Sequence, residues 1–207
     1  MNPNDRTTGR HDAHDEIAAS RIRNYRTYFE GWSNVTELDA RGRPRARKVY
    51  TGVYHKAALP DGQIRLIRGV YALLGLAAAG LFVLAATRPA AGNDAVVVSV
   101  AEAVSLGALT LLGWSLFNYL LSGLQMTLGE YRYAGSVRRA SLVCAVCLEL
   151  TAVSTLIYHI GHADGSYLCA ALFLLAGLAC AAIHRIEARM VYDVIPSEHT
   201  PAASEQE

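Results

Sequence analysis

The chain has 207 residues, of which 52% are hydrophobic, and a formal net charge of +1. This length leaves room for one membrane domain and one small polar segment, and for little more. The charge is an average over unlike parts, because residues 1–68 carry 13 Arg and Lys against 8 Asp and Glu. Arginine outnumbers lysine 17 to 2, a bias associated with GC-rich bacterial genomes, so we expect a bacterial protein.

The N-terminal part is polar and begins without an apolar core, so we expect no cleavable signal peptide. Residues 1–14 lack periodicity and are predicted to be disordered. The following residues, Asp15 to Phe29, have apolar side chains at helical spacing between arginines. Such a basic amphipathic helix can lie along an anionic membrane surface or pack on the strands that follow, and both interpretations stay open.

Two strands are predicted next, Trp32–Leu38 and Arg45–His55, as a β-hairpin. A lone hairpin is marginal in water, so the cytoplasmic module of residues 15–65 needs a covering helix, a second copy or the membrane surface. A run of basic residues follows one edge of this hairpin. Beside a membrane, these residues favour contact with anionic lipid or a protein partner over contact with nucleic acid. The alternative is that this edge of the hairpin is simply exposed to water. The basic residues of this run are Arg41, Arg43, Arg45, Arg47 and Lys48.

Four apolar runs without Lys or Arg follow the hairpin. As helices, about 20 such residues cross a hydrocarbon core about 30 Å thick. We therefore predict a transmembrane domain over residues 66–192 and a disordered cytoplasmic tail over residues 193–207. The predicted crossings are residues 69–87, 95–121, 140–158 and 167–183.

Arginines near the ends of these runs predict the orientation, because Lys and Arg stay on the cytoplasmic side. They stand before the first run, between the second and third, and after the fourth, at Arg65, Arg68, Arg132, Arg138, Arg139, Arg185 and Arg189. The predicted fold is an all-α membrane protein. It is a four-transmembrane-helix bundle, N-in/C-in, with a small cytoplasmic N-terminal helix plus β-hairpin segment. We expect a multi-pass protein of the bacterial plasma membrane.

Two acidic residues fall within the predicted crossings. Glu149 lies at the middle of the third, where an ionised carboxylate is costly, so we expect it to face protein or water. It can serve as a proton or cation site, or as a group that joins two helices through a hydrogen bond. The hydrogen bond between helices is the preferred interpretation. Glu102, in the second crossing, either reaches the outer interface or joins the same intramembrane site.

Small polar side chains form a stripe along the third crossing, opposite Glu149. They can line a polar pathway, although such groups more often bond to neighbouring helices or to their own carbonyls. The stripe comprises Thr151, Ser154, Thr155 and Tyr158. We expect no metal site at the nearby histidines and no redox activity at the cysteines. No cofactor is expected either.

The chain lacks a Walker loop, a dinucleotide-binding glycine pattern, a H-E-x-x-H helix and a serine nucleophile elbow. We therefore expect a non-enzymatic accessory or regulatory membrane protein that binds a protein partner or anionic lipid through its cytoplasmic module. The alternative is a small proton- or cation-coupled carrier or channel centred on Glu149. Small residues spaced four apart are compatible with tight packing within the bundle or with a homo-oligomer.

Overall fold

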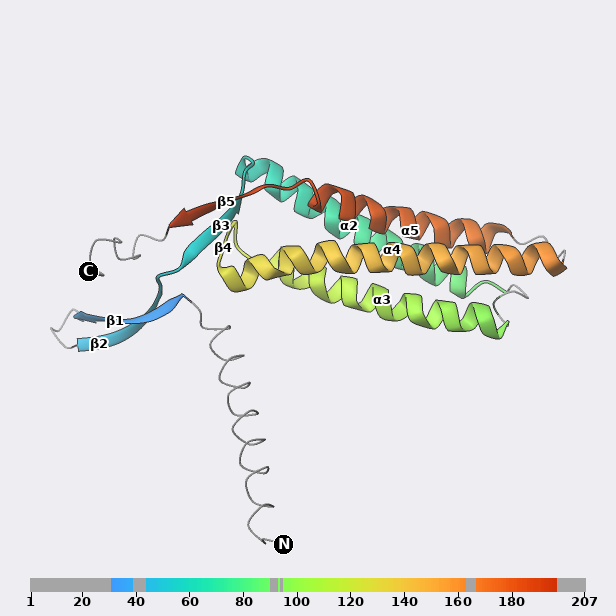
Figure 1. Cartoon of the computed structure of the whole chain (residues 1–207), viewed down its shortest axis with the longest axis horizontal. Coiled ribbons are helices and arrows are strands. Elements are labelled where there is room, and N and C mark those ends of the chain that lie inside the picture. The colour runs from blue at the N-terminus through green and yellow to red at the C-terminus, as the bar shows by residue number, and fades with distance from the viewer. Residues whose placement is uncertain (1–30, 39–43, 90–92, 94, 163–166, 197–207) are drawn as a thin grey trace, which may run out of the picture. The chain divides into compact units, whose positions relative to one another are not determined.

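A computed structural model of the protein describes residues 31–38, 44–89, 93, 95–162 and 167–196. Four of its helices are long and apolar enough to cross a membrane, as the sequence predicted (Figure 1). The predicted helix over residues 15–29 lies outside the described residues. The chain divides into two compact units. One holds nearly all of the four long helices, and the other holds the hairpin with residues 127–129 and 194–196.

The hairpin unit contains two antiparallel strands, β1 (Trp32–Leu38) and β2 (Pro44–Tyr50). Their register pairs Trp32 with Tyr50, and the two rings lie edge to face with centroids 5.4 Å apart. The Tyr50 side chain is buried, and its hydroxyl donates to the Val53 carbonyl at 3.0 Å. The same hydroxyl accepts a bond from the Leu128 backbone N–H at 3.1 Å. Within the described part of this unit, Tyr50 therefore contacts β1, the start of the next strand and the start of the helix at Leu128.

The prediction of one long second strand is wrong, because the backbone divides it into β2 and β3 (Val53–Ala57). The N–H groups of Thr51 and Gly52 both donate to the Gly31 carbonyl, at 2.6 and 3.1 Å. Gly31 has a φ of +87°, a conformation that favours glycine. A Cβ added at Gly52 would lie 2.7 Å from the Tyr50 ring. The two glycines thus permit a close crossing that ends the β1–β2 ladder.

Three of the four long helices are longer than the apolar runs that predicted them, and α3 is one residue shorter than its run. They are α2 (Asp61–Ala86), α3 (Val96–Leu121), α4 (Leu128–His162) and α5 (Tyr167–Glu187). Helix α2 starts directly after Pro60 and carries Asp61 in its first turn, which suits the positive N-terminal end of the helix dipole. Helix α4 has 35 residues, so it is about 52 Å long and exceeds the thickness of a hydrocarbon core.

Three short strands lie in one sheet in the order β4-β3-β5, where β4 is Gln125–Met126 and β5 is Tyr192–Pro196. Strands β3 and β4 are antiparallel, with His55 opposite Met126. No strand was predicted from the sequence at β4 or β5. Both are short segments next to helix ends, where alternation is too brief to signal a strand. We call this end of the bundle, where α2 and α4 begin and α3 and α5 end, the strand end.

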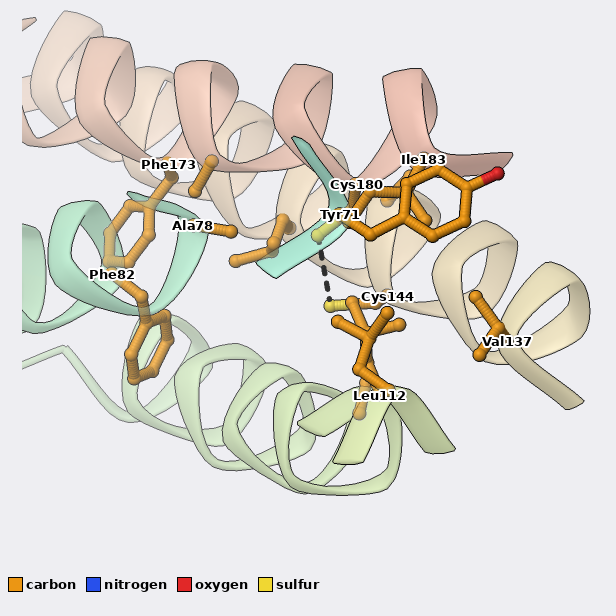
Figure 2. Packing of buried hydrophobic residues seen from close by; sticks show 14 of the residues in the cluster. Tyr71, Ala78, Phe82, Leu112, Val137, Cys144, Phe173, Cys180 and Ile183 are labelled. Carbon is orange, nitrogen blue, oxygen red and sulfur yellow. Dashed lines mark hydrogen bonds between the residues drawn. The ribbon is translucent and has the colours of Figure 1, made fainter. Parts of the chain in front are cut away.

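The helices pack around a core of apolar and small side chains (Figure 2). Helix α2 packs along α5 more extensively than along α3. Phe82 and Phe173 face each other across the α2–α5 contact, with ring centroids 5.8 Å apart. Between α4 and α5, the buried sulfur atoms of Cys144 and Cys180 lie 3.5 Å apart. Outside this core, many large apolar side chains are exposed, such as Leu76 at 73%. Exposed apolar faces of this kind suit contact with lipid chains.

Candidate functional site at the strand end

The last residue of α5, Glu187, has a buried carboxyl group with only 5% of the residue exposed. One carboxyl oxygen, Oε2, accepts a hydrogen bond of 2.8 Å from the hydroxyl of Tyr71 on α2. The other, Oε1, accepts a bond of 2.6 Å from the hydroxyl of Tyr192 on β5. Buried polar groups are costly without partners, and here each carboxyl oxygen has one. The carboxyl group therefore joins α2, α5 and β5.

A third tyrosine extends this network to α3. The hydroxyls of Tyr119 and Tyr192 lie 3.2 Å apart, and the rings of Tyr71 and Tyr119 have centroids 6.0 Å apart. Burial, together with the nearby negative charge of Glu187, raises the pKa of Tyr192. The Tyr192 hydroxyl thus keeps its proton and acts as a donor. We call Glu187, Tyr71, Tyr119 and Tyr192 the carboxyl–tyrosine cluster.

Next to this cluster, Arg68 of α2 caps the end of α3. Its Nη1 donates to the Ser122 carbonyl at 2.6 Å, and its Nη2 donates to the Gly123 carbonyl at 2.8 Å. The guanidinium also lies over the Tyr119 ring, 5.1 Å from the centroid. A cation at a helix C-terminus satisfies carbonyls that lack helical partners and favours the negative end of the dipole. All the hydrogen bonds of Arg68 within the described chain go to neutral oxygens.

Exposed arginines gather at the same end of the bundle. Six arginine side chains near the helix ends there are exposed. At the opposite end, Arg88 is the one exposed arginine among the described residues. Such a distribution places a positive field at one end of the bundle. The six are Arg65, Arg132, Arg138, Arg139, Arg185 and Arg189.

The structure places Glu149 half-buried on α4, against the backbone of α5. A Cβ added at Gly177 of α5 would lie 3.2 Å from the Glu149 Cγ and 3.4 Å from the Ala145 carbonyl oxygen. The missing side chain at Gly177 therefore makes the space that Glu149 occupies. This contact lies at a helix–helix interface.

Glu102 lies half-buried on α3, and one of its carboxyl oxygens is buried without a hydrogen-bond partner among the described residues. The structure does not join it to Glu149 through any hydrogen bond in the described chain. Thr151 lies on the side of α4 that faces α3. Its hydroxyl oxygen lies 2.8 Å from that of Ser105 and 3.2 Å from the Ala101 carbonyl oxygen. Glu149 instead contacts α5, so the two candidate features occupy different sides of α4.

Two further residues of the predicted stripe, Ser154 and Thr155, bond to their own helix. The hydroxyls of Ser154 and Thr155 both donate to the Thr151 carbonyl, at 2.9 and 2.8 Å. The Tyr158 ring is half-buried and lies edge-on to the ring of His159, with centroids 6.2 Å apart. Donors that bond to their own helix need no polar pathway to satisfy them.

Of the predicted basic run, Arg41 and Arg43 lie outside the described residues. Arg45, Arg47 and Lys48 belong to β2, and the register sets Arg45 opposite Glu37. Lys48 is exposed.

Among the described side chains, no three His, Cys, Asp or Glu residues come close enough to hold a metal ion. Cys144 lies in contact with Cys180 from another helix, and no disulfide bond joins the two sulfur atoms. Cys144 and Cys147 are spaced as C-x-x-C in the sequence. The sulfur contact of Cys144 is nevertheless with Cys180 of α5.

The carboxyl–tyrosine cluster was not predicted from the sequence. Glu187 stands among charged residues after an apolar run, which favours a solvated helix end. A signal was present in the spacing, because Glu187 continues the stripe of α5 that is buried against the other helices. That stripe contains Phe173, Ala176, Cys180, Ile183 and Glu187. A buried stripe ending in a carboxyl group indicates a hydrogen-bonded partner on another element.

No protein family, curated protein or solved structure matches the chain.

Proposed function

We propose that this protein is an accessory or regulatory subunit of the bacterial plasma membrane, without catalytic activity of its own. In this proposal it has both termini in the cytoplasm and binds a protein partner or anionic lipid through its hairpin unit. The observation that carries the proposal is the hairpin unit, whose β1–β2 sheet has two strands in the described part of the chain. A two-stranded sheet has edges that can accept a partner strand and is marginal without a cover.

Two further observations support this function. Trp32, at the start of β1, is 44% exposed, and aromatic side chains of this kind are common anchors at protein interfaces. The six exposed arginines at the strand end support an orientation with this end in the cytoplasm. Basic residues in β2 would then face an acidic protein surface or anionic headgroups.

A photo-crosslinking amino acid at position 32 of the full chain, expressed in native membranes, tests the proposal. We expect an adduct with a protein, or with lipid if headgroups are the ligand. The adduct should be lost when Arg45, Arg47 and Lys48 are changed to Gln. A matched control changes Arg138, Arg139 and Arg185 to Gln, which removes the same charge from the bundle.

The two types of adduct decide between protein and lipid as the ligand. The proposal is overturned if no adduct forms, or if the adduct survives the hairpin change as well as it survives the control change. Protease protection of the two termini in intact cells checks that both triple variants keep the wild-type orientation.

A further inference from the structure

An apolar groove of about 340 Å³ lies between α2 and α3. This volume falls in the range of about 300–1,000 Å³ that is common for ligand sites. The groove is lined by alanine, glycine, leucine and phenylalanine alone. The residues that shape it are Ala72, Gly75 and Ala79 of α2 and Gly113, Leu116 and Phe117 of α3.

The groove exists because small side chains of α2 and α3 line it beside a point where the two helices approach closely. At that point a Cβ added to Gly75 would lie 2.8 Å from the Leu116 Cδ1, so the backbone of α2 approaches α3 closely. At Gly113 an added Cβ would meet nothing within 4 Å, so this position opens onto unfilled space. The flanking side chains of Leu76 and Phe117 are 73% and 57% exposed. The groove is therefore open to the surface along the bundle.

Two arginines follow the groove at the strand end. At 100° per residue, Arg65 and Arg68 fall on the same face of α2 as Ala72 and Ala79. Arg68 lies about 6 Å along the axis from Ala72 and bonds to Ser122 and Gly123, directly after the groove residues of α3. The apolar groove thus ends at a guanidinium that bridges both helices.

The charge at this end of the groove is positive. Arg65 is exposed, and Arg68 bonds to neutral oxygens. Asp61, on the same face of α2, is paired with Lys56 at 2.9 Å, so that pair carries no net charge. Glu187 lies near enough to Arg68 for their charges to attract, but its hydrogen bonds go to tyrosines. Arg65 is the side chain placed to contact a ligand, and Arg68 adds its charge.

We propose that the α2–α3 groove binds one anionic phospholipid, with an acyl chain along the groove and the headgroup phosphate at Arg65. An acyl chain is apolar along its length and carries its charge at one end, as the groove does. Guanidinium groups bind phosphate oxygens in two-point geometry, and a basic residue near a membrane surface attracts an anionic lipid about fivefold. This site is separate from the hairpin unit and does not depend on its proposed partner.

Native mass spectrometry of the full chain in mild detergent tests the proposal, with phosphatidylglycerol and phosphatidylcholine of the same acyl chains added as probes. We expect one retained phosphatidylglycerol per chain and a clear preference over phosphatidylcholine. Arg65→Gln should reduce the preference about fivefold, and Arg65→Lys should retain most of it. Arg185→Gln removes an exposed arginine elsewhere at the strand end and is the matched control.

The groove itself is tested by Gly113→Leu, which places a side chain into the unfilled space. Gly107→Leu is the matched control, because Gly107 lies on the same helix, is exposed and meets nothing within 4 Å. Gly113→Leu should abolish retention of the lipid, whereas Gly107→Leu should leave it unchanged. Neither substitution enters the buried core, so folding should persist, and size-exclusion profiles check this.

Three outcomes overturn the proposal. The first is equal retention of the two lipids by the wild-type chain, which indicates a general lipid annulus. The second is an equal effect of the two leucine variants. The third is a wild-type chain that forms a dimer and retains no lipid, with the dimer dissociated by Gly113→Leu. That result assigns the groove to a second copy of the chain.

Discussion

The hydrogen bond between Tyr71 and Glu187 should stabilise the bundle measurably, and Tyr71→Phe tests this with the least disturbance. The change removes one hydroxyl and keeps the ring, which is fully buried. The Glu187 Oε2 then lies in a buried site without its 2.8 Å donor. A buried acceptor left without a partner costs about 1–3 kcal/mol, so we expect the free energy of unfolding to fall by that amount.

Glu187→Ala should have a comparable effect through the opposite partner. It leaves the Tyr71 hydroxyl without its acceptor, whereas the Tyr192 hydroxyl keeps Tyr119 at 3.2 Å. The uncompensated loss is therefore mainly that of one hydroxyl, again about 1–3 kcal/mol, with a further contribution from the lost side-chain volume. In the double variant both partners are gone, so the combined loss should be smaller than the sum of the single losses by about 1–3 kcal/mol.

The free energies can be measured by titrating SDS into mild-detergent micelles and following helix content by circular dichroism. Tyr167→Phe serves as the control, because Tyr167 is 55% exposed at the opposite end of α5. Its change should stay within about 0.5 kcal/mol of wild type. If Tyr71→Phe behaves like this control, or if the two single losses add within about 0.5 kcal/mol, the cluster does not hold the helices together.

Three further substitutions test the helix contacts. Gly177→Val should destabilise the bundle by about 1–3 kcal/mol in the same titration, because the added atoms meet Glu149, whereas Gly80→Val has open space and should be nearly neutral. Glu149→Gln should change the free energy of unfolding by less than about 1 kcal/mol. It should also leave the proton flux of reconstituted vesicles unchanged. If the wild-type protein has a measurable flux that this variant loses, the carrier alternative is favoured. Thr151→Val should cost about 0.5–1.5 kcal/mol, because it leaves the buried Ser105 hydroxyl without its 2.8 Å partner on α4.

The helices were predictable because their signal is local. An apolar run of membrane-spanning length is visible in one stretch of sequence, and all four runs became helices. Their ends were not predictable from hydropathy, since polar turns such as the start of α4 continue the helix beyond its apolar run. The break between β2 and β3 was missed because it depends on Gly31, about 20 residues earlier in the chain.

The carboxyl–tyrosine cluster could not be derived from composition, because its contacts are distant in sequence. Tyr71 and Glu187 are 116 residues apart, and Tyr119 and Tyr192 are 73 apart. Whether a charged residue at a helix end is solvated or buried depends on the rotation of that helix against its neighbours. The groove has the same origin, because Gly113 opens onto space only for the observed orientation of α3.

The two faces of α2 explain how the bundle can hold a tight core and an open groove together. One face packs along α5 through Tyr71, Ala78 and Phe82, all of which are buried, and the Tyr71–Glu187 bond fixes its strand end. The adjoining face meets α3 at Gly75, and Arg68 ties the two helices together at the strand end. Because α2 is already held by α5, its packing against α3 does not have to be complete. The space at Gly113 is therefore bounded by fixed walls, which is the condition for retaining one lipid in place of a general lipid layer.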